Sequence, residues 1–137
     1  MKIGYIDGVF DMFHVGHLNV IENAKARCDY LIVGVNSDEL RMSYKNKPGI
    51  IPFEERIRIV AAIRCVDEVY RVETLNKEVI WKEKPFDILF SGDDWKGHPR
   101  WIETERIMAT HNVKVIWLPY TRGTSSTLLR DKLESMT

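Results

Sequence analysis

Two histidines with a glycine between them stand three residues apart in the segment Asp7-Gly8-Val9-Phe10-Asp11-Met12-Phe13-His14-Val15-Gly16-His17. A helical pattern begins here, so we expect His17 in the first helical turn and Gly16 where a bulky ligand can approach the backbone. Unpaired N–H groups at a helix start, together with imidazole donors, suit an anionic phosphoryl group. Taken alone, the spacing is more typical of a surface pair or a metal site. A zinc site, however, would need a third ligand at matching spacing, and we find no obvious one.

Three further segments combine charge, hydroxyl groups or glycine. Residues 41–49 (RMSYKNKPG) carry three cations, which alone indicate a solvated mobile loop. Gly92-Asp93-Asp94-Trp95 alone is most often a turn with a partly buried tryptophan. Gly123-Thr124-Ser125-Ser126-Thr127 is typical of a helix N-cap, and the same geometry presents N–H and hydroxyl groups to an anion.

Strand-like and helix-like patterns alternate along the chain and must position these segments. The expected strands are 2–6, 30–35, 68–72, 87–90 and 113–118, and the expected helices are 17–27, 52–64, 77–84, 101–111 and 125–133. Such alternation predicts a single Rossmann-like, doubly wound α/β domain with a five-stranded parallel sheet. Ligands of such sheets bind at the carboxyl ends of the strands, here after Ile6, Val35, Phe90 and Leu118.

The composition limits the classes of function. The chain has 137 residues, 45% hydrophobic, with 20 Lys+Arg balancing 20 Asp+Glu, so it lacks the net positive charge of a nucleic-acid-binding protein. No uncharged run approaches the length of a membrane span, and the N-terminus does not read as a signal peptide. Cys28 and Cys65 form no metal-binding pair. We therefore expect one cytoplasmic domain over residues 1–137 without membrane insertion.

The stretch from Tyr5 to His17 resembles the HxGH-bearing nucleotidyltransferases, and within them the cytidylyltransferases that activate phosphorylated alcohols. The likeness runs from Ile3 to about Lys132. The remaining segments that carry it are Gly34-Val35-Asn36-Ser37-Asp38-Glu39, Phe53-Glu54-Glu55-Arg56, Arg64-Cys65-Val66-Asp67-Glu68-Val69, Gly92-Asp93-Asp94-Trp95 and Thr121-Arg122-Gly123-Thr124-Ser125-Ser126-Thr127. The short length and Gly-Asp-Asp-Trp are most similar to the bacterial glycerol-3-phosphate enzymes.

The resemblance implies a reaction and a set of site residues. A phosphate oxygen of the phospho-alcohol would attack the α-phosphorus of CTP in line, without a covalent intermediate, giving a CDP-alcohol and pyrophosphate. His14, His17, Lys45 and Lys47 would be catalytic, with Arg56 supporting the lysine loop. The phospho-alcohol would bind Arg64 and Asp67. The nucleotide would contact Gly8, Val9, Phe10, Asp11, Gly16, Asp38, Gly92, Asp94, Trp95, Tyr120, Thr121, Arg122, Gly123, Ser125, Ser126 and Thr127.

The resemblance further implies Mg²⁺ bound with the nucleotide phosphates, and a homodimer. Three positions depart from the family pattern: Val9 replaces a threonine, Tyr120 an arginine, and Arg122 stands where glycerol-3-phosphate enzymes have glutamate. Adenylyl transfer to a sugar phosphate or a vitamin-like phosphate is therefore an alternative. A second alternative is a non-catalytic nucleotide-binding protein, against which the intact histidines and lysines argue.

Overall fold

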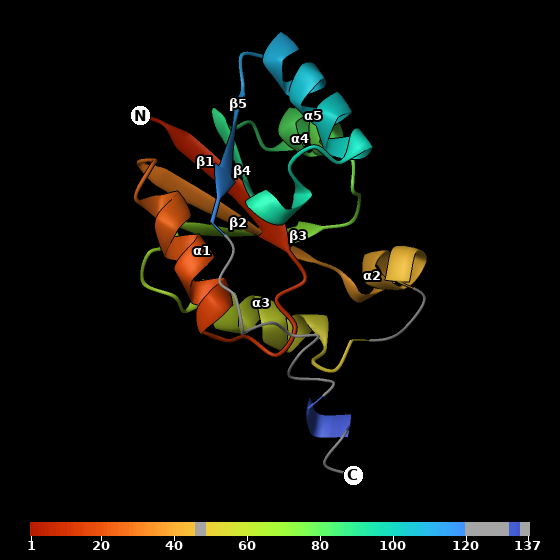
Figure 1. Cartoon of the computed structure of the whole chain (residues 1–137). Coiled ribbons are helices and arrows are strands. Elements are labelled where there is room, and N and C mark those ends of the chain that lie inside the picture. The colour runs from red at the N-terminus through yellow and green to blue at the C-terminus, as the bar shows by residue number, and fades with distance from the viewer. Residues whose placement is uncertain (46–48, 120–131, 135–137) are drawn as a thin grey trace.

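The computed structural model describes residues 1–45, 49–119 and 132–134. Strands and helices alternate along the chain (Figure 1). In order they are β1 (Ile3–Gly8), α1 (Val15–Lys25), β2 (Tyr30–Asn36), α2 (Asp38–Lys45), α3 (Phe53–Ala61), β3 (Glu68–Val72), α4 (Lys77–Glu83), β4 (Ile88–Gly92), the 3-10 helix η1 (Asp93–Trp95), α5 (Pro99–Thr110) and β5 (Lys114–Leu118).

The five strands form one sheet in the order β3-β2-β1-β4-β5, and every pairing is parallel. This confirms the predicted doubly wound α/β domain. The strand order reverses at β1, which pairs with β2 from Ile3↔Tyr30 to Gly8↔Val35 and with β4 on its other side. The carboxyl end of β1 is therefore the switch point at which ligands of such sheets bind.

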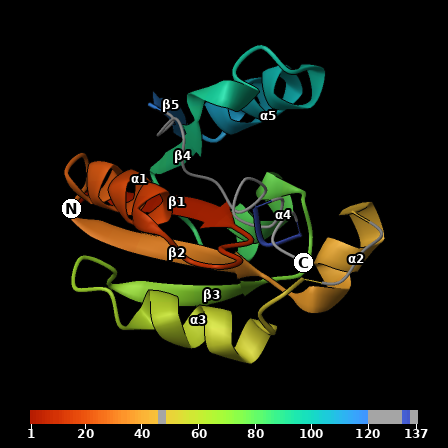
Figure 2. The same ribbon diagram turned by 60° about the horizontal axis from the view of Figure 1, so that its bottom comes forward.

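A separate hydrophobic core covers each face of the sheet, because alternate strand residues point to opposite faces. One core contains Ile21 of α1 and Val60 of α3, and the other contains Ile80 of α4 and Met108 of α5. Figure 2 shows α3 beside β3 at one end of the sheet and α5 near β4 and β5 at the other. Helices thus cover both faces and leave the carboxyl ends of the strands to the loops.

The expected loop at residues 41–49 is wrong in its first half, because residues 41–45 belong to α2. The Ser37 hydroxyl accepts a hydrogen bond from the Leu40 amide, and Asp38 and Glu39 occupy the first turn, where they favour the helix dipole. Arg41 is buried in this helix rather than solvated. Only Leu40 gave an apolar signal on the buried side, which is why periodicity did not reveal the helix.

The ends of the elements differ from the predicted ones by a few residues. Asp7 and Gly8 continue β1 instead of ending it, and α1 begins at Val15, so that His17 lies in its first turn as expected. The expected helix 125–133 lies mostly outside the described residues, which include a helical turn at 132–134. In the described ranges, no helix has the length and apolar character needed to cross a membrane.

Candidate active site

The two histidines form the N-terminal cap of α1. His14 is the N-cap residue, and its Nδ1 accepts a hydrogen bond from the Gly16 amide at 3.0 Å. The Nδ1 of His17 accepts in turn from the His14 amide at 3.2 Å. This is a capping box in which both acceptors are imidazoles, a role usually filled by serine or threonine and glutamate or glutamine. The spacing of the two histidines therefore has a structural cause as well as a chemical use.

These bonds determine where each imidazole carries its proton. Since Nδ1 accepts in both rings, a neutral ring holds its proton on Nε2 and can donate it to a ligand. Burial lowers the pKa of His14, and burial together with the neighbouring His14 lowers the pKa of His17 to about 4. Both rings are thus neutral donors at neutral pH. They stack with their centroids 3.9 Å apart, so the two donors lie close together.

The Nε2 atom of His14 is buried, and none of the described residues offers it a hydrogen-bond partner. A buried donor without a partner costs about 1–3 kcal/mol, and in native proteins its explanations include a catalytic role and a bound ion or water. A ligand that supplies an anionic oxygen at this position would remove that cost. The geometry of α1 thus points to an anion at the histidines.

The loop that leads to His14 has an unfavourable backbone conformation. Phe10 and Met12 adopt left-handed φ values of 53° and 49°. Such a conformation costs a non-glycine residue about 1–2 kcal/mol, so the surrounding structure must hold the loop in place. The buried Asp11 carboxylate does so by accepting hydrogen bonds from the amides of Ile50 and Ile51 at 3.0 and 2.9 Å.

Arg56 of α3 joins the loops at this edge of the sheet. Its guanidinium is 1% exposed and donates to the backbone carbonyls of Val9, Asn36 and Ile51 at 2.7–2.9 Å. It also pairs with the Asp38 carboxylate at 2.6 Å. Because Ile51 follows the lysine segment, the predicted support of that segment by Arg56 agrees with these bonds.

Asp38 has partners within the protein. Burial acts to raise the pKa of this carboxyl, but hydrogen bonds from the Phe53 amide and from Arg56 outweigh it and hold the pKa below its usual range. About half of the side chain is exposed. Its visible role is to fix the start of α3, and contact with a nucleotide stays a prediction.

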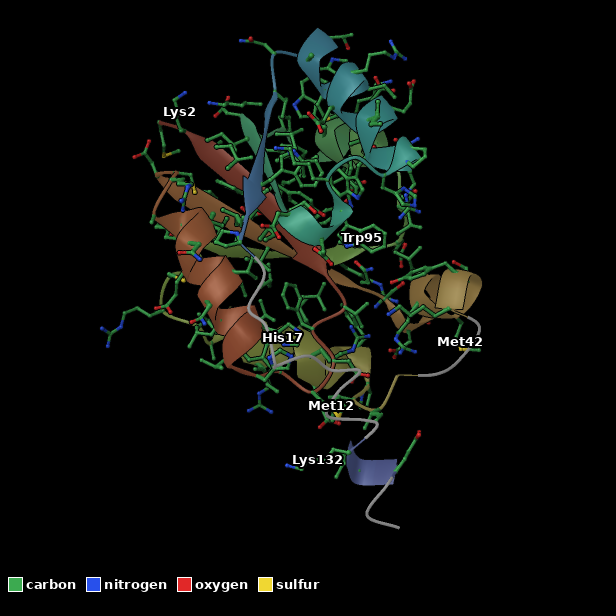
Figure 3. All side chains as sticks on the ribbon, in the orientation of Figure 1. Lys2, Met12, His17, Met42, Trp95 and Lys132 are labelled. Carbon is green, nitrogen blue, oxygen red and sulfur yellow. The ribbon has the colours of Figure 1, made fainter. Side chains whose placement is uncertain are left out.

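The other predicted residues at the carboxyl edge lie as follows. Gly8 ends β1, Lys45 is the exposed last residue of α2, and Gly92 ends β4. Asp94 and Trp95 are exposed in η1. In Figure 3, His17, Met12 and Trp95 all lie nearer the edge where β1 and β5 end, whereas Lys2 marks the opposite edge.

Gly16 does not leave its amide open to a ligand, because that amide donates to His14. Lys47 and the closing signature lie outside the described residues. That signature comprises Tyr120, Thr121, Arg122, Gly123, Ser125, Ser126 and Thr127.

The predicted substrate residues Arg64 and Asp67 are placed away from the histidines. They precede β3, at the amino edge of the sheet, because α3 runs antiparallel to the strands and ends there. Asp67 pairs with Lys25 at 2.6 Å and accepts from the Leu31 amide at 2.8 Å, and these bonds lower its pKa. Arg64 is exposed. Asp67 therefore pairs with Lys25 and not with Arg64 as expected, while binding of the phospho-alcohol by these two residues stays a prediction.

Three polar residues, Asp7, Asn36 and Lys77, have structural features that the sequence analysis did not predict. Asp7 pairs with Lys77, and Asn36 is 6% exposed. The sequence did offer a signal for two of them: Asp7 and Asn36 are polar residues that continue the otherwise apolar strands β1 and β2.

The sequence of the chain matches a known protein family. The pattern of the family described as "Cytidylyltransferase-like" matches residues 5–132. The chain is 32% identical over 136 residues to glycerol-3-phosphate cytidylyltransferase of Bacillus subtilis (strain 168), covering 94% of this chain and 95% of that protein. It is 38% identical over 117 residues to FAD synthase of Pyrococcus abyssi, covering 84% and 78%.

The fold also matches a solved structure. The lipopolysaccharide core biosynthesis protein from Thermoplasma volcanium superposes with a TM-score of 0.75 at 22% identity, over 90% of this chain and 99% of that one. At this identity the match supports the fold alone.

Proposed function

The chain belongs to the cytidylyltransferase-like family of nucleotidyltransferases, and from that premise we propose that it transfers CMP from CTP to a phosphorylated alcohol, with glycerol 3-phosphate as the best candidate. The products would be a CDP-alcohol and pyrophosphate. The full-length similarity to a glycerol-3-phosphate cytidylyltransferase supports the choice of substrates.

The observation that carries the reaction is the buried Nε2 of His14, which has no partner among the described residues. In an in-line displacement, the substrate phosphate is already anionic and needs no base, so catalysis consists of positioning and of stabilising the charge that develops. The Nε2–H groups of His14 and His17 would donate to the α-phosphate and to the leaving oxygen. Their lowered pKa values suit this role, because a neutral imidazole donates without losing its proton.

Cations would complete the phosphate site. Lys45 ends α2 beside the segment that Asp11 and Arg56 hold in place, and we assign it and Lys47 to the triphosphate. A lysine on a flexible stem can follow phosphate charge as it redistributes. We assign the signature from Tyr120 to Thr127, with Arg122, to the outer phosphates.

Mg²⁺ would accompany the nucleotide. Within residues 1–45, 49–119 and 132–134, no three His, Cys, Asp or Glu side chains converge into a metal site. Mg²⁺ commonly keeps several waters and binds through substrate phosphates, which suits a site poor in protein ligands. It would neutralise phosphate charge there.

Adenylyl transfer is the second candidate, favoured by one observation. A relative of comparable identity is named FAD synthase, which corresponds to a vitamin-like phosphate as acceptor. Val9, Tyr120 and Arg122 depart from the cytidylyltransferase pattern and keep this candidate open.

The decisive experiment measures pyrophosphate release with four nucleoside triphosphates and several acceptor phosphates. We expect CTP to exceed ATP and UTP by more than ~10²-fold, because a pocket that hydrogen-bonds the base leaves polar groups unpaired with the wrong one. Asp94→Ala should erode this preference, whereas Arg122→Ala should raise KM for every triphosphate alike. Preference for ATP with a vitamin-like phosphate would establish the second candidate instead.

A further inference from the structure

Helix α2 extends away from the sheet and carries Lys45 at its end. Figures 1 and 2 both show this helix set apart from the other helices. The residue before it is fixed, because the Ser37 amide donates to the Val72 carbonyl at 2.9 Å. Along the helix, the Tyr44 hydroxyl accepts a hydrogen bond from the side-chain amide of Asn36 at 3.1 Å. The direction of α2 therefore determines where Lys45 lies.

Arg71 of the edge strand β3 holds α2 from another side. Its Nη2 donates to the Glu39 carboxylate of α2 at 3.1 Å, and its Nε donates to Glu73 at 2.7 Å. Glu39 lies roughly 140° around the helix from Tyr44, since each residue turns an α-helix by about 100°. The two contacts thus oppose a sideways tilt of α2 in different directions.

The same guanidinium contacts the start of α3. It lies over the Phe53 ring, 4.5 Å from the centroid, where a cation is attracted by the negative face of the ring. Phe53 is buried, and its amide donates to the carboxylate of Asp38, the first residue of α2, at 3.1 Å. Arg71 therefore joins the start of α2 to the start of α3, the two helices that flank the lysine segment.

The surroundings of Arg71 require an arginine. Its hydrogen bond with Glu73 and the charges of Glu73, Glu39 and Glu54 raise its pKa, so three carboxylates act on one cation. A planar guanidinium can donate to two carboxylates while its face lies on an aromatic ring. The compact ammonium of a lysine cannot make all of these contacts at once.

We propose that Arg71 is a positioning residue, which acts through α2 to hold Lys45 where the triphosphate binds. This rests on the proposed nucleotidyl transfer, in which Lys45 contacts the phosphates. From Ser37, Glu39 lies roughly 3 Å along the helix axis and Lys45 roughly 12 Å, so a tilt moves Lys45 about four times as far as Glu39. Misplacing a positioned group by about 1 Å can lower a rate ~10²-fold.

The first test measures pyrophosphate release with CTP varied at saturating glycerol 3-phosphate and Mg²⁺. Arg71→Met should lower kcat/KM for CTP at least ~5-fold, a partial loss because α2 keeps its other bonds. KM for glycerol 3-phosphate should not change, because the tether acts on the lysine alone. A changed KM for glycerol 3-phosphate, or an unchanged kcat/KM for CTP, would overturn the proposal.

Arg106→Met is the matched control. Arg106 also pairs with an exposed glutamate, Glu103, but on α5. Its replacement removes an arginine–glutamate pair of the same kind and should leave both kinetic constants unchanged. A loss for CTP as large as that of Arg71→Met would assign the effect to surface charge in general and reject the inference.

A double-mutant cycle tests the route through α2. Glu39→Gln removes the partner on the helix and leaves Arg71 with Glu73. It should reproduce part of the loss in kcat/KM for CTP, and adding it to Arg71→Met should cause no further loss, because the two residues form one ion pair. Losses that add would show that they act separately and would reject this route.

Hydrogen exchange of the α2 amides in the protein without ligands tests the tether without turnover. Arg71→Met should speed this exchange about 3-fold, the scale of one exposed ion pair, and Arg106→Met should not. Unchanged exchange in Arg71→Met would reject the inference whatever the turnover.

The proposed function and this inference fail in different ways. If CTP supports no pyrophosphate release with any acceptor, the proposed function fails. Calorimetric titration of CTP with Mg²⁺ then decides the inference: weaker binding to Arg71→Met than to the wild type and to Arg106→Met supports it. Equal binding to the three proteins, or none, rejects it.

Discussion

Each histidine has a structural bond at one ring nitrogen and a proposed chemical role at the other. For His14 the two can be separated, because asparagine caps a helix well and alanine does not. We expect His14→Asn and His14→Ala each to lower kcat by ~10²-fold or more, the scale of losing a preorganised donor. Only His14→Ala should also lose about 0.5–2 kcal/mol of stability, measured by urea unfolding. Near-normal turnover of His14→Asn would refute the donor role.

The titration of His17 makes stability depend on pH. Its pKa is about 4 in the folded chain and near 6.5 when unfolded, so the unfolded chain binds more protons between these values. This contribution to stability is therefore present above pH 6.5 and is lost as the pH falls toward 4. Protonation would also turn the Nδ1 acceptor of His17 into a donor facing the His14 amide.

His17→Gln isolates this effect, since glutamine is a natural residue at that position of a capping box. The free energy of unfolding should drop less in this variant than in wild type between pH 7 and 4.5, by urea titration. The carboxylates and His14 titrate in both proteins and cancel in the comparison. Parallel pH profiles would show that His17 is not the group responsible.

At the scale of elements, Arg56 holds three loops and α2 together. Arg56→Met would leave three backbone carbonyls without their donor, and we expect a loss of more than about 3 kcal/mol in the free energy of unfolding. Arg58→Met, on the exposed side of the same helix, is the matched control and should change stability by less than about 0.5 kcal/mol. Similar unfolding midpoints for the two variants would contradict this role.

The elements also show what sequence patterns can predict. The apolar run Tyr30–Val35 identified the buried strand β2, and apolar residues spaced three or four apart identified α3. Both patterns are visible in the sequence because they arise from which side chains are buried. Helix α2 was missed since its stability comes from the Ser37 cap and from the burial of Arg41, neither of which is periodic. The Asp7–Lys77 pair joins residues 70 apart, and only the folded topology brings them together.

For the candidate site, motif spacing located the histidines and the strand ends correctly. The position of Arg64 and Asp67 at the amino edge could not be predicted, because a sequence motif does not say which edge of the sheet it occupies. Helix direction decides that, and α3 carries its C-terminus to the amino edge.

At the scale of the whole molecule, the resemblance predicts a homodimer, although nothing in the single chain requires one. Light scattering at working concentration should give about twice the 16.0 kDa of one chain. Dilution over a hundredfold range serves as the control for weak association. A particle of one chain's mass at every concentration would contradict this prediction.

The capping role of His14 and His17 affects how long these residues persist in related sequences that lose the activity. A side chain that starts a helix remains under selection for folding even in a descendant that has stopped turning over nucleotides. His14 and His17 would therefore persist in such a descendant after its activity is lost. In surveys of genomes for active relatives of this protein, an intact pair of histidines is then weak evidence of turnover.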